Sequence, residues 1–377
     1  MKITRGELLK RSALAAAALA GWRAFDISPA RASTIGYGPL GQPDANGLRL
    51  PAGFHGRLLA KSGEPVLNTS YIWPGQPDGS GTFSRTNGGW VLAVNSELNG
   101  TSGGASAIRF AANGEPYAAY RILSGTKWNC AGGKTPWGTW LSCEEFRNGL
   151  VWECDPFRPS QGVARRALGV FPHEAAPVDP ATGYVYLTED DYDACLYRFR
   201  PIERGNLDAG TLEAASVAGN GAVTWRTISP KQPYRGKDTT QFQRPEGAWI
   251  SHGHLFFTTT ADDRVWALRL STMRLSVIYD GLGADASDSL HEPDNVTVHE
   301  ATGALFVAED ADDLQLVQLA QASNGWTATP FLQFVGHDGS EVTGPSFSPD
   351  GTRLYVTSQR GTDGDGMTFE ITGAFAV

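Results

Sequence analysis

The sequence lacks several patterns that mark common chemistries. It contains only four cysteines in 377 residues and no Cys-x-x-Cys pair, which argues against a structural zinc site. No Gly-x-Ser-x-Gly segment is present to supply the serine nucleophile of a hydrolase. Apolar residues with helical spacing are scarce, and no apolar run has the length of about 20 residues that spans a bilayer. A zinc finger, a serine hydrolase of that type and a stable membrane insertion are therefore not expected.

A nucleotide-binding P-loop is also missing, although one segment ends in similar letters. Residues 129–145 read NCAGGKTPWGTWLSCEE. A P-loop requires a glycine five residues before its Gly-Lys-Thr, where this chain has Trp128, and a helix must follow. Here Pro136 and a predicted strand follow Thr135, so no helix N-terminus is available to hold phosphate.

The N-terminus has the layout of an export signal. Basic residues precede the short apolar run SALAAAALAG, and Ala30-Arg31-Ala32 forms a small-x-small cleavage site. We therefore predict a signal peptide over residues 1–32, a mature chain that begins near Ser33, and a periplasmic or secreted protein. The segment TRGELLK resembles the twin-arginine motif with Gly6 in place of the second arginine, which leaves the export route open. The alternative is a disordered or membrane-surface N-terminal helix.

The mature chain is acidic. Without residues 1–32 it has 25 Lys and Arg against 38 Asp and Glu, a net charge of −13. Such a surface repels nucleic acid and suits a protein that holds cations. The mature chain contains all four cysteines, Cys130, Cys143, Cys154 and Cys195. In an oxidising compartment some of them could form disulfides. Cys143 and Cys154 flank a predicted hairpin, but the sequence does not fix their pairing.

A repeat of about 50 residues organises the chain. Six segments share a turn glycine, an alternating apolar strand and a polar or acidic turn. They are GWVLAVNSE, GTWLSCEE, GYVYLTEDD, GHLFFTTTADD, GALFVAEDADD and GTRLYVTSQR, and their glycines are 49, 45, 70, 50 and 48 residues apart. This spacing is typical of propeller blades, whereas a two-sheet sandwich would not give evenly spaced copies. We predict an all-β fold, one six-bladed β-propeller over residues 33–377, with the 200–240 region as an insertion.

Carboxylates recur at one phase of this repeat. The strand that precedes each later glycine begins with an acid or a thiol, and these residues are Cys130, Glu174, Glu246, Asp294 and Glu341. In a propeller that strand is the innermost of its blade, so the five residues should ring one mouth of the central channel. Crowded like charges oppose folding unless cations neutralise them, which predicts a metal cluster there. For any single acid, the alternative is a solvated turn former.

Further candidates lie near this ring. A weaker set of acids ends the repeat strands, at Glu144, Glu145, Glu189 and Glu309. Carboxylate oxygens suit Ca²⁺, Mg²⁺ or Mn²⁺, and a thiolate beside them suits iron or another transition metal. Arg244 and Arg360 could hold a phosphate or carboxylate in a bidentate fork, or form salt bridges across the channel mouth. His173 beside Glu174 could be a ligand or could support one.

These segments together resemble a known family. NCAGGKTPWGTWLSCEE, HEAA, TEDD, RPEGAW, PDN and GPSFSPDGTRLYV occur in the order found in the PhoX family of secreted bacterial alkaline phosphatases, over about residues 50–377. The resemblance implies a six-bladed propeller, twin-arginine export, a calcium and iron (Fe³⁺) cluster at the channel and hydrolysis of phosphate monoesters. It also implies iron binding by Cys130 and phosphate binding by Arg244. The implied carboxylate ligands are Glu246, Asp294 and Glu341, with Glu174 or Glu189 and the Glu144-Glu145 pair as further candidates.

The interpretation that the sequence favours is a metal-dependent phosphomonoester hydrolase whose partners are a phosphate ester and the export machinery. Arg244, Glu246 and Arg360 are its predicted catalytic residues. The alternatives are a calcium-dependent lactonase or phosphodiesterase, and a propeller without activity in which calcium only stabilises the channel. A lactonase would need neither Cys130 nor Arg244. This chain is shorter than the well-known phosphatases of the family.

Overall fold

The computed structural model describes residues 36–229, 233–283, 289–310, 313–323 and 325–375. The predicted signal peptide over residues 1–32 lies outside the described residues. The described part is built almost entirely from strands, with two short 3₁₀ turns at η1 (Arg166–Leu168) and η2 (Thr260–Asp262). Within it no helix is both long and apolar enough to cross a membrane.

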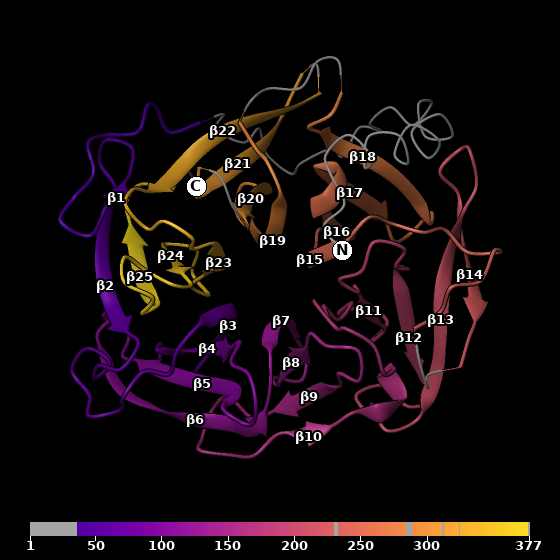
Figure 1. Cartoon of the computed structure of the whole chain (residues 1–377), viewed down its shortest axis with the longest axis horizontal. Helices are drawn as coiled ribbons and strands as arrows, with labels where there is room; N and C mark the ends of the chain where they lie inside the picture. The colour runs from indigo at the N-terminus through magenta and orange to yellow at the C-terminus, as the bar shows by residue number, and fades with distance from the viewer. Residues whose placement is uncertain (1–35, 230–232, 284–288, 311–312, 324, 376–377) are drawn as a thin grey trace.

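Six sheets stand around a central axis as the blades of a propeller (Figure 1). The first two blades, from the axis outwards, are β3 (Pro77–Ser84), β4 (Trp90–Ser96), β5 (Gly103–Phe110) and β6 (Pro116–Thr126), then β7 (Asn129–Lys134), β8 (Trp140–Glu144), β9 (Val151–Cys154) and β10 (Val163–Ala164). The predicted all-β fold and its six blades are confirmed.

The third and fourth blades continue the same antiparallel pattern. Their strands are β11 (Val185–Leu187), β12 (Tyr197–Pro201), β13 (Gly210–Val217) and β14 (Val223–Thr227), then β15 (Pro245–Ser251), β16 (His254–Thr259), β17 (Arg264–Arg269) and β18 (Arg274–Asp280). The inner segment of blade 3 pairs with the blade through two isolated bridges, His173 to Glu189 and Val178 to Val185. The predicted insertion at 200–240 is only partly an insertion, because β13 and β14 are the regular outer strands of blade 3.

The last two blades are completed by strands from the start of the described chain. They consist of β19 (Pro293–His299), β20 (Ala304–Glu309), β21 (Gln315–Ala322), β22 (Gly325–Phe334) and β1 (Leu48–Arg49), then β23 (Val342–Phe347), β24 (Arg353–Ser358), β25 (Met367–Thr372) and β2 (His55–Lys61). The outermost strand of blade 6 is thus β2, which pairs antiparallel with β25. This pairing closes the ring without a covalent link.

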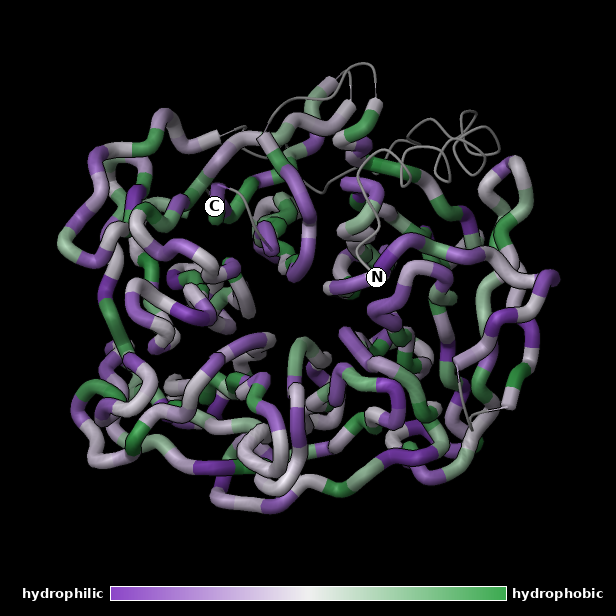
Figure 2. The backbone as a smooth tube through the Cα atoms, viewed as in Figure 1, coloured by the Kyte–Doolittle hydropathy of each residue, from purple (hydrophilic) through white to green (hydrophobic). Residues whose placement is uncertain are grey.

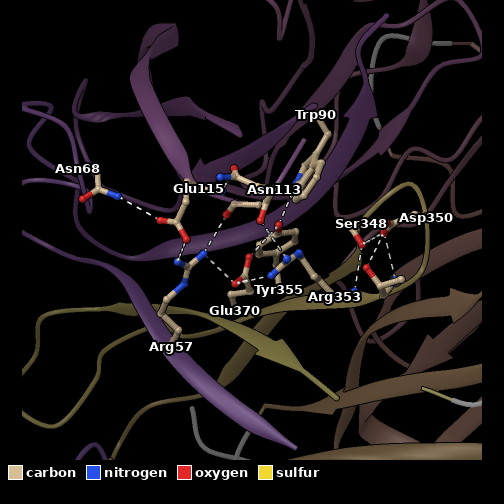
Figure 3. A network of polar contacts seen from close by, with 12 residues as sticks. Arg57, Asn68, Trp90, Asn113, Glu115, Ser348, Asp350, Arg353, Tyr355 and Glu370 are labelled. Atoms are coloured by element: carbon tan, nitrogen blue, oxygen red, sulfur yellow. Dashed lines mark hydrogen bonds and ion pairs between the residues drawn. The ribbon is translucent and has the colours of Figure 1, made fainter. Parts of the chain in front are cut away.

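A polar network reinforces that closure between blades 6 and 1 (Figure 3). Glu370 of β25 is buried and accepts ion pairs from Arg57 of β2 at 2.8 Å and from Arg353 of β24 at 3.0 Å. Arg57 also pairs with Glu115 of blade 1 at 2.8 Å. A hydrogen bond from Trp90 Nε1 to the Tyr355 hydroxyl, 2.8 Å long, adds a second link between the same blades.

The apolar core lies between blades rather than at one centre. Hydrophobic segments recur in every blade in Figure 2, as expected when each sheet packs against two neighbours. Phe257 and Trp266 stack at 5.9 Å within one cluster, and Phe306 and Phe331 meet edge to face at 5.2 Å in another. The inner strands, with their polar residues, surround the central axis.

All four cysteines are buried and free. The predicted hairpin between Cys143 and Cys154 is present as β8 and β9, but Cys143 faces Val151 and Cys154 faces Trp140 in its register. The two thiols are therefore in different apolar clusters and do not form a disulfide. Burial raises the pKa of both thiols, which makes them unreactive core residues.

Candidate metal centre

A bulge in the inner strands positions a ring of side chains at one mouth of the channel. In β3, β7, β15, β19 and β23, two successive residues have no partner in the register with the next strand. Such a bulge changes the direction in which its side chains point. In the five strands, in this order, the first residue of the bulge is Asp78, Cys130, Glu246, Asp294 and Gly344. In blade 3, Glu174 follows the bridge at His173 in the equivalent place. The ring therefore has four acids, one thiol and one glycine.

The sixth blade departs from the predicted pattern. Glu341 was expected at the ring position, but the register gives that position to Gly344. A Cβ on Gly344 would lie 2.4 Å from the carbonyl oxygen of Asp78, so the backbone approach leaves no room for a side chain. Glu341 instead precedes β23, and its carboxylate reaches the mouth from the preceding turn.

Asp78 is a ring residue that the sequence analysis missed. A sequence motif could have identified it, because Pro77-Asp78-Gly79 has the same Pro-acid-Gly form as Pro245-Glu246-Gly247. The glycine after the acid is a structural requirement at both places. A Cβ on Gly79 would be 2.5 Å from the Cα of Ala131, and one on Gly247 would be 2.6 Å from the carbonyl oxygen of Asp294. A Pro-acid-Gly triplet thus marks a bulge that touches the next blade.

A second set of acids follows the second strand of four of the six blades. The weaker set was predicted at the last strand residue, but the side chains that face the ring come one residue later. These residues are Glu97, Glu145, Asp190 and Asp310, and the set includes only Glu145 from the predictions. Backbone hydrogen bonds fix this position, since Glu145 N donates to Trp128 O at 2.8 Å and Asp310 N donates to Glu292 O at 3.1 Å. Successive side chains of a strand point in opposite directions, so one residue decides which group reaches the channel.

The predicted candidates Glu144 and Glu189 have other partners. The two Glu144 oxygens accept the backbone N–H groups of Lys127 and Leu150, each at 3.2 Å. Glu189 accepts the Tyr197 hydroxyl at 2.6 Å and an ion pair from Arg235 at 2.7 Å. Both carboxylates therefore hold the blade ends together, and neither belongs to a group of possible ligands within the described residues.

Three groups of possible metal ligands remain. In each group one ligand atom per residue lies within 4.8 Å of the others. The groups are Cys130 with Glu145 and Glu174, Asp78 with Glu97 and Glu341, and Glu174 with Glu246 and Asp294. Glu174 is shared by two of the groups, and Cys130 Sγ lies 3.6 Å from Asp78 Oδ2 of the third, so the sites would form one connected centre.

Burial makes the charges of this centre costly. It raises the pKa of Asp78 to about 7, with the Glu97 carboxylate as the next cause. Burial also raises the pKa of Glu174, Glu246 and Asp294 well above the usual range, and neighbouring carboxylates add to each shift. Without a cation, burial and the neighbouring carboxylates favour the protonated form of these groups.

The donor set fits bound cations. Asp78 Oδ1 and Glu174 Oε2 are buried oxygens without a hydrogen-bond donor, and Glu246 Oε1 has only its ion pair with Arg244. An unsatisfied buried carboxylate oxygen is rare and costly, and a cation satisfies several at once. Burial and the neighbouring acids also raise the pKa of the Cys130 thiol, so that sulfur would become a thiolate only beside a metal. The described residues therefore offer hard oxygen ligands and one soft sulfur ligand.

Arg244 lies among these acids. Its Nε and Nη2 donate to the two Asp190 oxygens at 2.7 and 3.0 Å, and Nη2 is 2.7 Å from Glu246 Oε1 without hydrogen-bond geometry. The residue has a φ of 53°, held by hydrogen bonds from its N–H to Asp191 O and from Thr260 N–H to its carbonyl. The acid near Nη1 is Asp310, whose Oδ2 is 3.8 Å from this nitrogen. This nitrogen can therefore meet a further anion.

Arg360 is placed to contact a substrate at the channel mouth, whereas His173 is not placed to bind a metal. Arg360 Nη2 lies 3.3 Å from Glu341 Oε1, and its side chain is 37% exposed at the mouth. His173 is fully buried, packs against Phe171 with tilted rings whose centroids are 3.7 Å apart, and is hydrogen bonded to Gly169 O at 3.2 Å. Burial lowers the pKa of His173 to about 3, so the ring is neutral. His173 packs behind the centre and does not belong to the three groups of described residues.

Comparison with known proteins supports the resemblance read from the sequence. Residues 98–276 match the family described as alkaline phosphatase PhoX. The structure is similar to Pseudomonas fluorescens PhoX in complex with vanadate, a transition state analogue, with a TM-score of 0.71 and 19% identity over 89% of this chain and 97% of that one. It is also similar to XC5397 of Xanthomonas campestris, a gluconolactonase, with a TM-score of 0.51 and 12% identity over 92% of this chain and 99% of that one. No curated protein matches the sequence. The structural likenesses establish the propeller, and the family match bears out the resemblance over residues 98–276.

Proposed function

We propose, from the premise that residues 98–276 match the alkaline phosphatase PhoX family, that this chain hydrolyses phosphate monoesters at the channel mouth. The observation that carries the proposal is the location of Arg244. One of its nitrogens is available beside three connected groups of possible metal ligands. Cations and a guanidinium that converge on one place suit a phosphoryl group, whose charge is spread over several oxygens.

We infer that the ions are calcium and iron. Calcium suits the groups made of carboxylates alone, Asp78 with Glu97 and Glu341, and Glu174 with Glu246 and Asp294. Iron suits the group that contains Cys130, because sulfur is a softer ligand than oxygen. Bound metals would polarise the phosphoryl oxygens and neutralise their charge.

The side chains of this chain bind and orient the substrate. Asp190 holds the Arg244 guanidinium through two hydrogen bonds, which fixes the direction in which Nη1 points. Nη1 donates to a non-bridging phosphoryl oxygen, and this contact strengthens as charge builds in the transition state. Arg360, exposed at the rim, attracts the substrate and contacts its outer oxygens. Glu246 balances the charge of Arg244 and contributes to the ligand set.

We also propose that the protein works outside the cytoplasm. The predicted signal peptide over residues 1–32 supports periplasmic or secreted localisation and contact with the export machinery. An oxidising compartment does not conflict with the free cysteines, because all four are buried. Recovery of exported protein with an intact Met1 would contradict this proposal.

The test is hydrolysis of a chromogenic phosphate monoester by purified protein, measured before and after chelation and after addition of Ca²⁺, iron or both. We expect full activity only with both ions. A phosphodiester and a sugar lactone are assayed under the same conditions. Faster turnover of the lactone with Ca²⁺ alone would contradict the proposal in favour of a lactonase, and no turnover of any ester with both ions would contradict an enzymatic role.

A further inference from the structure

The far mouth of the channel contains a cavity that the metal centre does not use. β7 begins beside Cys130 and ends at Lys134, about 13 Å further along an extended strand. A cavity of about 280 Å³ opens there, between the ends of β7 and β15 and the turns that follow the inner strands of blades 3 and 5. Its walls include Lys134, Pro136, Pro177, Pro180, Trp249 and Glu300.

A narrow waist separates this cavity from the metal centre. The waist has a volume of about 30 Å³ and is lined mainly by small residues of the inner strands, such as Gly132, Ala175 and Gly247. That volume is on the scale of a single water molecule. None of the residues that line the far cavity belongs to the three ligand groups, so the far cavity is a separate site.

Lys134 brings an unpaired charge to this cavity. Its Nζ lies 5.8 Å from the ring centroid of Phe83 and 5.9 Å from that of Trp249. Across the residues that the structure describes, this nitrogen has no hydrogen bond or salt bridge. Burial lowers the pKa of Lys134, while the Glu300 carboxylate acts in the opposite direction. An ammonium group partly removed from water needs an anion nearby.

The other walls indicate what kind of anion fits. Trp249 and three prolines form an apolar surface beside the ammonium group. Glu300 lies at the rim with its side chain 62% exposed, and it accepts hydrogen bonds from Ser251 Oγ at 2.7 Å and Trp249 Nε1 at 3.4 Å. Its negative charge repels a doubly charged phosphate more than a singly charged carboxylate. The volume is near the lower end of the roughly 300–1,000 Å³ typical of small-molecule sites.

We propose that the far mouth of the channel binds a small organic monocarboxylate with an aromatic or apolar body. The carboxylate pairs with Lys134 Nζ, and the body lies against Trp249 and the surrounding prolines. Lys134 belongs to the segment that resembles a P-loop, so its lysine would serve anion binding at a place unrelated to nucleotides. This inference does not depend on the proposed hydrolysis.

The test measures binding of phenylacetate to the metal-loaded protein by isothermal titration calorimetry, with inorganic phosphate as the second probe. We expect phenylacetate to bind and phosphate to give no heat assignable to Lys134. Lys134→Met should weaken phenylacetate binding at least about tenfold, the scale of one charge-assisted hydrogen bond, while Lys134→Arg keeps most of the affinity. Lys237→Met removes the same charge from an exposed position and should leave the affinity unchanged.

A second variant, with the opposite expected effect on affinity, tests the proposal even if the Lys134 variants misfold. Glu300→Gln removes the repulsion at the rim and should tighten phenylacetate binding about threefold. Phosphatase activity, where present, should be the same in all these proteins. Equal phenylacetate affinity in the wild type and Lys134→Met, weaker binding to Glu300→Gln, or no binding to the wild type would each overturn the proposal. Phosphate binding that is lost in Lys134→Met would overturn the preference for carboxylates.

Discussion

Cys130 Sγ lies 3.2 Å from Glu174 Oε1, across the boundary between blades 2 and 3. The same sulfur is 3.6 Å from Asp78 Oδ2 of blade 1. One side chain therefore contacts acids from two other blades, and a cation held there would link three blades near the axis. The metal centre is thus expected to contribute both to chemistry and to the integrity of the ring.

The role of the thiol can be tested with Cys130→Ser. This change replaces a soft sulfur with a hard, mostly protonated oxygen. We expect iron content to fall while calcium is largely retained, and phosphatase kcat to fall by on the order of 10²-fold, the scale of losing one transition-state contact. Metal analysis by mass spectrometry and steady-state kinetics provide the measurements.

Cys154→Ser is the matched control for this experiment. Cys154 is also a buried free thiol, but it packs in an apolar cluster away from the acids. Since no disulfide is lost, the change should alter stability by about 1 kcal/mol and leave metal content intact. Full iron content and full activity in Cys130→Ser would remove the thiolate from the mechanism.

A second prediction concerns the acid that the sequence analysis missed. Asp78→Asn removes one charge from the group that it forms with Glu97 and Glu341. We expect bound calcium to fall by about one ion per chain, the number that one ligand group can hold, together with a lower melting temperature, because ions that bind the folded state stabilise it. Glu144→Gln is the control, since its carboxylate accepts backbone N–H groups and should not change the calcium content. Equal calcium loss in both variants would show that Asp78 is not a specific ligand.

The sequence predicted the architecture well because the repeat is a property of spacing. Turn glycines about 50 residues apart, each followed by an alternating strand, determine six blades whatever their detailed packing. The ring positions of Cys130, Glu174, Glu246 and Asp294 followed from the same phase. The correction at Glu341 arose from register, because the bulge in β23 begins at Gly344, three residues after Glu341.

For the second set of acids, the repeat spacing is not enough to predict which side chain reaches the metal centre. Glu144 and Glu145 are adjacent, and only Glu145 joins a ligand group. The backbone hydrogen bond from Glu145 N to Trp128 O places that residue just beyond the strand, and such a contact between blade ends cannot be read from a repeat offset. The contacts of Glu189 with Arg235 likewise depend on the loop before β15, which has no counterpart in the repeat.

Chelation should reverse the usual effect of pH on stability. In the metal-free folded protein, burial raises the pKa of Asp78 to about 7, whereas an unfolded aspartate titrates near about 3.9. The folded state then holds more protons than the unfolded state, so stability is highest below the unfolded value and falls as pH rises through the folded value. Glu174 and Glu246 have pKa values shifted in the same direction.

Melting curves in excess chelator at pH 5 and pH 8 test this sign. We expect the chelated protein to melt at a lower temperature at pH 8, and the gap between chelated and calcium-loaded protein to widen with pH. In Asp78→Asn the difference between the two pH values should shrink, because one of the titrating groups is gone. A chelated wild type that melts higher at pH 8 would contradict the assignment of these acids as a costly buried cluster.

The closure of the ring leads to the last prediction. Glu370→Gln keeps the shape of a side chain that is 2% exposed and removes the charge that pairs with Arg57 and Arg353. The loss is about 2 kcal/mol, the scale of hydrogen bonds to a charged group, because Arg57 and Arg353 are 31% and 24% exposed and stay partly solvated. We expect the urea midpoint of the calcium-loaded protein to fall accordingly.

Glu115→Gln removes the other acid bound to Arg57, but Glu115 is 50% exposed, and an exposed pair contributes only about 0–1 kcal/mol. The two variants therefore separate the buried link between β2, β24 and β25 from the exposed link to blade 1. Equal midpoints would mean that the main-chain pairing of β2 with β25 closes the ring by itself. A selective loss in Glu370→Gln would show that the ion pairs hold the first and last parts of the described chain together, and with them the two blades that supply Asp78 and Glu341 to one metal group.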